Sequence, residues 1–177
     1  MHKGQQRAAV KAAKKVAVPG CHASGFNLIV SPLVEAGLVP PTYPIVCTSI
    51  TGFSGGGKKL IAAYGENTTG VAERQGKEST QDQRVAPRPY ALTLAHKHLP
   101  EMRVVSGLAQ NPVFVPIIGD FYRGMAVCIA FERRLLAKPA GAKEIAAALR
   151  EAYAGEKFVR VAAEVNPSTE LDEGFFR

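Results

Sequence analysis

The sequence lacks any apolar run long enough to cross a membrane, and Met1-His2-Lys3 does not open a signal peptide. Cysteine is scarce: Cys21, Cys47 and Cys128 are scattered without the spacing of a disulfide framework, which suits a reducing cytoplasm. Metal-ligand spacings such as C-x-x-C and H-E-x-x-H are also missing. We therefore expect a cytoplasmic protein with no membrane partner and no metal.

Acidic residues are missing from the first part of the chain, which explains most of the formal net charge of +7. Five basic residues precede the first acidic one: Lys3, Arg7, Lys11, Lys14 and Lys15. The remaining 17 basic residues nearly balance the 15 acidic ones. The excess belongs to one N-terminal helix, as a solvated face or as a contact surface for a further domain. Aromatic and basic residues do not interleave as single-strand binders require, so we expect no nucleic-acid partner.

Length and composition favour a single domain over residues 1–177, since 46% hydrophobic and 21% charged residues are ordinary globular values. Residues 65–86 are polar and predict a long surface loop. Helices are expected at Gln5–Lys15, Ala23–Gly37 and Gly141–Ala154, with a helical turn at Lys58–Tyr64. Strands are expected at Lys15–Val18, Ile45–Ile50, Tyr90–Ala95, Arg103–Leu108, Val113–Ile118, Met125–Glu132 and Phe158–Ala163. The predicted fold class is α+β, with a mixed, largely antiparallel sheet and helices on one side.

One cysteine stands where a thiolate is favoured. Cys21 follows Val18-Pro19-Gly20, at the predicted turn from a strand into a helix. Unpaired N–H groups and the helix dipole at such a turn stabilise a negative sulfur. The alternative is a buried, inert cysteine. Cys47 and Cys128 lie in apolar, strand-like runs where burial is expected, so Cys21 is the predicted reactive thiol.

Two of the four histidines fall in the short stretch His96-Lys97-His98-Leu99-Pro100-Glu101. In a strand, residues two apart point to one face, so both rings could line one cleft. A cysteine with a nearby histidine and an orienting carboxylate is the general arrangement of thiol catalysis. A metal site and exposed histidines on a polar turn are the alternatives.

Three stretches together resemble one enzyme family. They are Val18-Pro-Gly-Cys-His-Ala-Ser-Gly-Phe26, Ser49-Ile-Thr-Gly-Phe-Ser-Gly-Gly-Gly-Lys-Lys59, and Pro87-Arg-Pro-Tyr-Ala-Leu92 continuing to His96-Lys-His-Leu-Pro-Glu101. In this order they look like N-acetyl-gamma-glutamyl-phosphate reductase, in its shorter bacterial branch. His22 and Ser24 depart from the family pattern, which more often has an aromatic or aliphatic residue and a threonine there. Neither departure removes a reacting group.

The resemblance implies a two-domain enzyme related to glyceraldehyde-3-phosphate dehydrogenase. One domain is a Rossmann unit that binds the nicotinamide cofactor, and the other carries the cysteine, the histidine and the dimer contacts. This sequence has no G-x-G-x-x-G after a strand. We therefore expect a catalytic and dimerisation domain alone, forming a homo-oligomer through its sheet. NADP(H) would be bound mainly by the missing nucleotide-binding domain.

The resemblance also implies a reaction, a step of arginine biosynthesis. Cys21 would attack the acyl phosphate of N-acetylglutamyl 5-phosphate and expel phosphate. Hydride from NADPH would then reduce the thioester to N-acetylglutamate 5-semialdehyde. His98 or His96 would be the acid and base, and Glu101 would have an orienting role. The isolated chain is not expected to oxidise NADPH by itself.

Substrate contacts are implied at two places. Ser54, Gly55 and Lys58 lie in the glycine-bearing stretch that suits a dianionic leaving group, and Arg88 suits the α-carboxylate of the substrate. A solvated glycine turn and an exposed arginine are the alternatives. The alternative function is a non-catalytic oligomerisation module, or a truncated remnant that keeps the fold without reductase activity.

Overall fold

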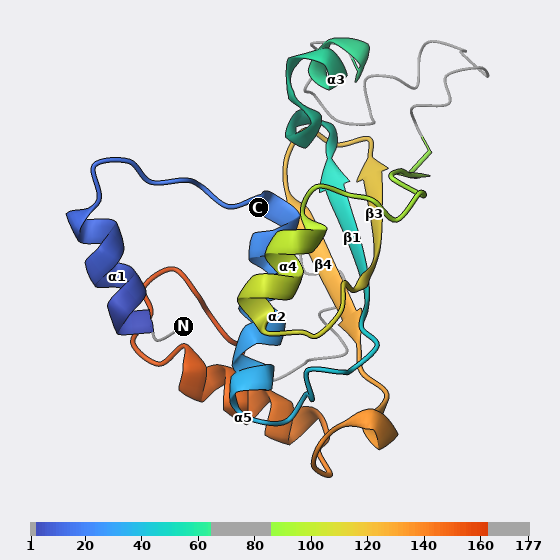
Figure 1. Ribbon diagram of the computed structural model, residues 1–177. Helices are drawn as coiled ribbons and strands as arrows, with labels where there is room; N and C mark the ends of the chain where they lie inside the picture. The colour runs from blue at the N-terminus through green and yellow to red at the C-terminus, as the bar shows by residue number, and fades with distance from the viewer. Residues whose placement is uncertain (1–2, 65–85, 163–177) are drawn as a thin grey trace.

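The computed structural model describes residues 3–64 and 86–162 (Figure 1). In chain order the helices and strands are α1 (Lys3–Ala12), α2 (Cys21–Glu35), β1 (Val46–Gly52), η1 (Phe53–Gly56), α3 (Gly57–Tyr64), β2 (Arg88–Pro89), α4 (Leu99–Ser106), β3 (Val113–Gly119), β4 (Met125–Ala130), η3 (Arg133–Leu135) and α5 (Ala142–Ala152). Most of the predicted loop, residues 65–85, lies outside the described residues. No helix in the part that the structure describes is long and apolar enough to cross a membrane.

Four strands form one mixed sheet in the order β2-β3-β1-β4. The central pair, β1 and β3, is parallel, whereas β4 runs antiparallel to β1 and β2 runs antiparallel to β3. The parallel register places Gly52 opposite Gly119, so both central strands end at the same edge. This arrangement confirms the α+β class and the mixed, largely antiparallel sheet.

Helix α2 packs the core against the sheet. Its four fully buried apolar residues follow helical spacing, at Ala23, Phe26, Val30 and Leu33. Gly37, with φ +65°, ends the helix, and the N–H groups of Leu38 and Val39 both donate to the carbonyl of Leu33. The predicted helix is therefore confirmed, but it begins at Cys21 itself.

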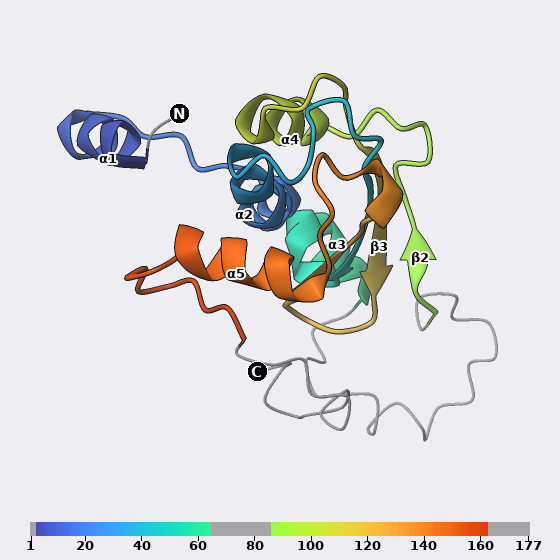
Figure 2. The same ribbon diagram turned by 90° about the horizontal axis from the view of Figure 1, so that it is seen from below.

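The helices α2, α4 and α5 lie on one side of the sheet (Figure 2). Helix α1 stands apart from this layer and is linked to it through an exposed ion pair, Arg7 to Glu156, at 2.6 Å. Such an exposed pair contributes little to stability. The basic N-terminal helix is thus present, but it is not part of the core.

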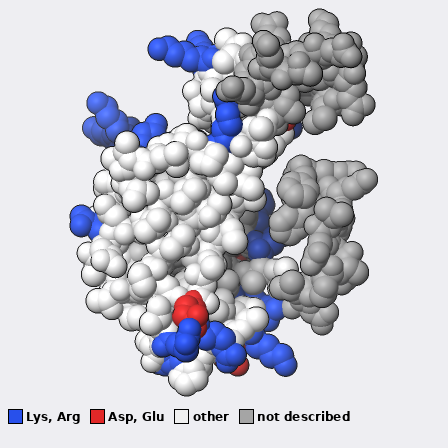
Figure 3. Space-filling view, turned by 90° about the vertical axis from the view of Figure 1, so that its right-hand side faces the viewer, with Lys and Arg blue, Asp and Glu red and all other residues white. Residues whose placement is uncertain are grey.

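The opposite face of the sheet carries no helix among the described residues. Outward-facing positions alternate with buried ones along β1 and β3, as a half-buried strand requires. Val46, Ile50 and Val113 remain 41–49% exposed there, and the neighbouring β4 exposes Ala126, Cys128 and Ala130. Charged groups lie mostly along the rim of this side of the molecule (Figure 3). We call these six residues the open sheet face.

The strand predicted at Arg103–Leu108 is wrong, because this stretch belongs to α4. Pro100 and Glu101 occupy its first turn, and Gly107 closes it with φ +78°. These are helix start and stop signals. These signals outweigh the strand preference of the β-branched residues Val104 and Val105, which are exposed on the helix surface.

Three further predicted strands are absent from the described residues. Beyond the two residues of β2, the stretch 90–95 turns instead, with Ala91 at φ +51° and Leu94 at φ +55°. The stretches 15–18 and 158–162 form no ladder, and Val18 and Phe158 are 89% and 91% exposed. A short apolar run therefore failed as a strand wherever no neighbouring strand was available to pair with it.

Candidate active site

A cavity of about 720 Å³ lies where α2 begins, beside the end of β1 and the segment that joins β2 to α4. Its lining includes Cys21, His22, Arg88, Tyr90, His96 and His98, all of which carry reactive or polar groups. The structure therefore brings together the cysteine and both histidines that the sequence had singled out.

Cys21 is the first residue of α2 and is exposed. Gly20 before it is extended, with φ −65° and ψ 144°, and its carbonyl accepts from the N–H of Ser24. The sulfur thus stands at a helix N-terminus, where free N–H groups and the dipole favour an anion. The predicted strand before this turn is missing, but the turn into the helix is present.

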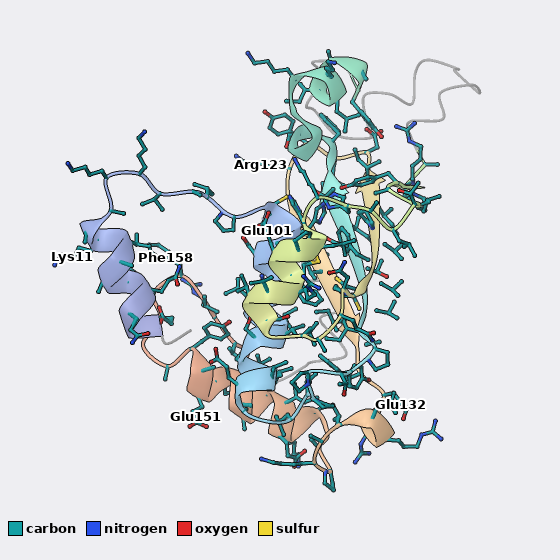
Figure 4. The ribbon with its side chains drawn as sticks, in the orientation of Figure 1. Lys11, Glu101, Arg123, Glu132, Glu151 and Phe158 are labelled. Atoms are coloured by element: carbon teal, nitrogen blue, oxygen red, sulfur yellow. The ribbon has the colours of Figure 1, made fainter. Side chains whose placement is uncertain are left out.

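Glu101 acts on the backbone before Cys21. Its Oε2 accepts a hydrogen bond from the N–H of Gly20 at 2.8 Å (Figure 4). Among the described residues, Nδ1 of His98 is buried and has no hydrogen-bond partner, so Glu101 does not hold that ring by a hydrogen bond. The carboxylate therefore fixes the turn that carries the sulfur.

The ring of His98 fills the space beside Gly20. A Cβ atom on Gly20 would lie 2.1 Å from Nε2 of His98 and 2.3 Å from its Cδ2. Glycine at position 20 is therefore required for close approach of the imidazole, and not for its backbone angles. This contact puts His98 directly against the residue that precedes the thiol.

His96 and His98 both line the cavity, but no strand places them there. They sit in the turn that enters α4, where Nδ1 of His96 accepts from the backbone N–H of His98 at 3.1 Å. Their ring centroids are 4.6 Å apart. Burial lowers the pKa of both rings, with Lys97 adding to the effect and Glu101 opposing it at His98. Both rings are therefore mostly neutral near pH 7.

His22 is a buried third histidine, which sequence reasoning had noted only as a departure from a family pattern. Its Nδ1 lies 2.8 Å from the Ser49 hydroxyl, and its Nε2 lies 2.9 Å from the Tyr90 hydroxyl. Burial, followed by the charges of His98 and His96, lowers the pKa of His22 to about 4. An imidazole with two side-chain partners and this pKa is neutral at pH 7.

The residues expected to bind substrate divide into two groups. Gly55 and Arg88 line the cavity, whereas Ser54 and Lys58 do not. Arg88 is held by a hydrogen bond to the Tyr64 hydroxyl at 2.6 Å, and its buried Nε has no partner among the described residues. Thr51 and Lys97 also line the cavity, although neither was predicted. Thr51 follows Ser49 on the same face of β1, so strand periodicity could have indicated it.

The other two thiols differ from each other. Cys47 is buried, and this burial, together with the nearby Cys128, raises its pKa to about 12. Cys128, predicted to be buried, is instead exposed on the open sheet face. That prediction was wrong because β4 is an edge strand and its outward positions have no covering layer. Within residues 3–64 and 86–162, no three or more His, Cys, Asp or Glu side chains are arranged so that they could hold a metal ion.

Comparison with known proteins decides the family. A family described as "Semialdehyde dehydrogenase, dimerisation domain" matches residues 21–173. The chain belongs to this semialdehyde dehydrogenase family. Among its curated relatives, N-acetyl-gamma-glutamyl-phosphate reductase of Trichormus variabilis is 40% identical over 97% of the chain, and that of Chelativorans sp. is 38% identical over 88%.

The chain spans about half the length of these curated relatives, 51% and 46% respectively. N-acetyl-gamma-glutamyl-phosphate reductase 2 of Nostoc sp. gives the same picture, at 40% identity and 51% of its length. The matching half is the one that the family description assigns to dimerisation. In this member of the semialdehyde dehydrogenase family, that half also contains the cavity with Cys21.

Gly20→Ala is expected to destabilise the fold by about 1–3 kcal/mol, because the added methyl group overlaps the His98 ring. Gly55→Ala is the matched control, since its Cβ would only meet Thr51 Oγ1 at 3.4 Å. Urea unfolding of both variants measures the difference. Equal stability of the two would contradict the close approach of His98 to Gly20.

Acidification is expected to destabilise the chain through His22. The unfolded imidazole has the ordinary pKa of 6.5, so between that value and about 4 the unfolded state binds the extra proton. Stability conferred by neutral His22 is therefore complete above pH 6.5 and is lost as the pH falls. Between pH 7 and 4.5 the free energy of unfolding should drop by about 2 kcal/mol more for the wild type than for His22→Gln. Identical drops would show that folding does not lower the pKa of His22.

Proposed function

We propose that this chain is the thiol-bearing part of an N-acetyl-gamma-glutamyl-phosphate reductase, which forms N-acetylglutamate 5-semialdehyde from N-acetylglutamyl 5-phosphate. The observation that carries the proposal is the meeting of an exposed Cys21 at a helix N-terminus with His96 and His98 in one cavity. The names of the curated relatives support the substrate.

Acyl transfer to Cys21 is the step that the described residues perform. The sulfur attacks the acyl carbon, the carbonyl electrons move to its oxygen, and on their return the bond to the phosphate oxygen breaks. A thioester forms and inorganic phosphate leaves. The N-terminus of α2 stabilises the attacking sulfur, and Glu101 keeps the turn before it in place.

His98 is proposed to take the thiol proton, because its ring contacts Gly20 and its lowered pKa leaves it neutral. His96 is the alternative, and its Nδ1 is already engaged by the backbone N–H of His98. That bond leaves the proton of neutral His96 on Nε2. His96 is therefore better suited to donate a hydrogen bond than to accept the proton through Nδ1.

Two parts of the cavity are proposed to hold the substrate. Arg88 would bind its carboxylate, since a guanidinium matches two carboxylate oxygens and Tyr64 already orients it. Gly55, near the end of β1, would receive the phosphate through backbone N–H groups. Ser54 and Lys58 lie outside the cavity lining and would act only if the phosphate reached beyond it.

The cofactor is proposed to be NADP(H), bound outside the described residues. The glycine cluster after β1 forms the 3-10 turn η1 and lacks the G-x-G-x-x-G spacing. The described residues therefore do not fit the pyrophosphate of a dinucleotide, and we derive no step through it.

A homo-oligomer is proposed to form through the open sheet face. Its exposed apolar side chains have no covering layer among the described residues, and the family description names dimerisation. The same face would serve a non-catalytic oligomerisation module, the second candidate function. The two candidates differ in the chemistry of Cys21 and not in assembly.

Ile50→Glu is expected to shift the chain from dimer to monomer at micromolar concentration, because it buries a charge in an apolar interface. Val104→Glu is the control, since Val104 is 70% exposed on α4, in the helical layer. Sedimentation velocity measures both. Dissociation by Val104→Glu but not by Ile50→Glu would place the interface elsewhere.

Acetyl phosphate, a minimal acyl phosphate, is expected to acetylate Cys21 and release one equivalent of phosphate. Peptide mass mapping and a phosphate assay measure both products. Cys21→Ser should abolish the reaction, whereas Cys128→Ser, which removes the other exposed thiol, should leave it intact. Acetylation of Cys128 at the same rate as Cys21 would favour the non-catalytic module.

A further inference from the structure

His22 joins two hydroxyl groups that the mechanism above does not use. Its ring is 3% exposed, with Ser49 on Nδ1 and Tyr90 on Nε2. Tyr90 lines the same cavity as Cys21, whereas Ser49 is fully buried behind His22. The three residues therefore form a chain from the protein interior to the cavity.

The position of the His22 proton follows from the hydrogen bonds available to Ser49. Among the described residues, the Ser49 hydroxyl has only one side-chain partner, Nδ1 of His22. If Nδ1 carried the proton, the Ser49 proton would be buried without an acceptor, at a cost of about 1–3 kcal/mol. If Ser49 donates to Nδ1, each hydroxyl and ring nitrogen of Ser49, His22 and Tyr90 that takes part in these hydrogen bonds has a partner. The neutral ring then carries its proton on Nε2.

An Nε2–H group donates to the Tyr90 oxygen, so the hydroxyl proton of Tyr90 cannot point back at His22. It points to the cavity instead. We propose that His22 is a positioning residue that turns the Tyr90 O–H toward the carbonyl oxygen of the acyl group on Cys21. The inference rests on the proposed function, because it names a donor for that acyl transfer.

The Tyr90 O–H would act when negative charge develops on the carbonyl oxygen of the acyl group. As the sulfur attacks, the carbonyl electrons move to the oxygen, and the Tyr90 O–H donates a hydrogen bond to it without losing its proton. When those electrons return, phosphate leaves and the hydrogen bond weakens. Burial, followed by the charge of Cys21, raises the pKa of Tyr90, and the second cause agrees with the proximity of the two groups.

The surroundings keep His22 in its neutral form. The rings of His96, His98 and Phe114 lie with their centroids 5.8, 5.7 and 5.2 Å from that of His22. No carboxylate is bonded to any of these three imidazoles in the described parts of the chain. A protonated His22 would donate from both nitrogens and force Ser49 to accept.

Nitrogen NMR of the ¹⁵N-histidine-labelled chain tests the orientation directly. At pH 7 the His22 ring, assigned by its loss in His22→Gln, is expected to show an unprotonated Nδ1 and a protonated Nε2. The opposite tautomer would overturn the proposal. This measurement does not depend on any activity, so it stands even if Cys21 proves not to accept acyl groups.

Tyr90→Phe tests the donor. Acetylation of Cys21 by acetyl phosphate should slow by about 100- to 1,000-fold, as loss of one preorganised donor predicts. Acetylation by p-nitrophenyl acetate, which has no phosphate, should slow to a similar extent. Alkylation by iodoacetamide, which develops no oxyanion, should change less than about twofold. Slowing with acetyl phosphate alone would assign Tyr90 to the phosphate and overturn the carbonyl assignment.

Variants of His22 and Ser49 test the positioning. His22→Gln keeps an N–H donor for Tyr90 and should retain most of the acetylation rate, whereas His22→Phe should match Tyr90→Phe, with no further loss in the double variant. Ser49→Ala removes the hydrogen bond that fixes the tautomer of His22 and should slow acetylation. Ser31→Ala, the control, should not slow it. If the wild type is acetylated but all these variants match it, the positioning role of His22 is overturned and the proposed function stands. If the wild type is not acetylated, the proposed function fails.

Discussion

The site depends on how two elements meet at Gly20. The carboxylate of Glu101 holds the Gly20 N–H, and the ring of His98 occupies the space where any other residue would carry a side chain. Both groups come from the start of α4, while Gly20 precedes α2. One contact therefore fixes the first turn of α2, the imidazole and the carboxylate together. The packing of α2 on α4 is, in this sense, part of the candidate active site.

Burial gives the clustered imidazoles their common character. His22, His96 and His98 lie within 6 Å of one another by ring centroid, and the pKa of each is lowered. Because desolvation disfavours the charged form, the three neutral rings can pack together without a counter-ion, and the rings of His22 and His96 also contact Phe114. Neutral rings can accept a proton or orient a hydroxyl at neutral pH. A cluster of protonated rings could do neither.

The sequence predicted long periodic elements and motif residues better than short strands. Helix α2 could be recognised from its apolar spacing, and Cys21 from the Pro-Gly turn before it. The entry into α4 was missed because Val104 and Val105 outweighed the Pro100 and Glu101 signals. The partners of His22 could not be predicted, since Ser49 and Tyr90 are 27 and 68 residues away from it along the chain. Only the sheet register and the turn after β2 bring them together.

Strand β1 shows how one small domain could support both the proposed chemistry and the proposed assembly. Its buried side, with Ser49 and Thr51, faces the helices and reaches the cavity through His22. Its other side, with Val46 and Ile50, belongs to the open sheet face. Because neighbouring residues on a strand point to opposite faces, a change at Ile50 leaves the hydrogen bonds of Ser49 intact. An interface on the open sheet face would therefore stabilise β1 without contacting the acyl group. Assembly would then affect the rigidity of the site and not its chemistry.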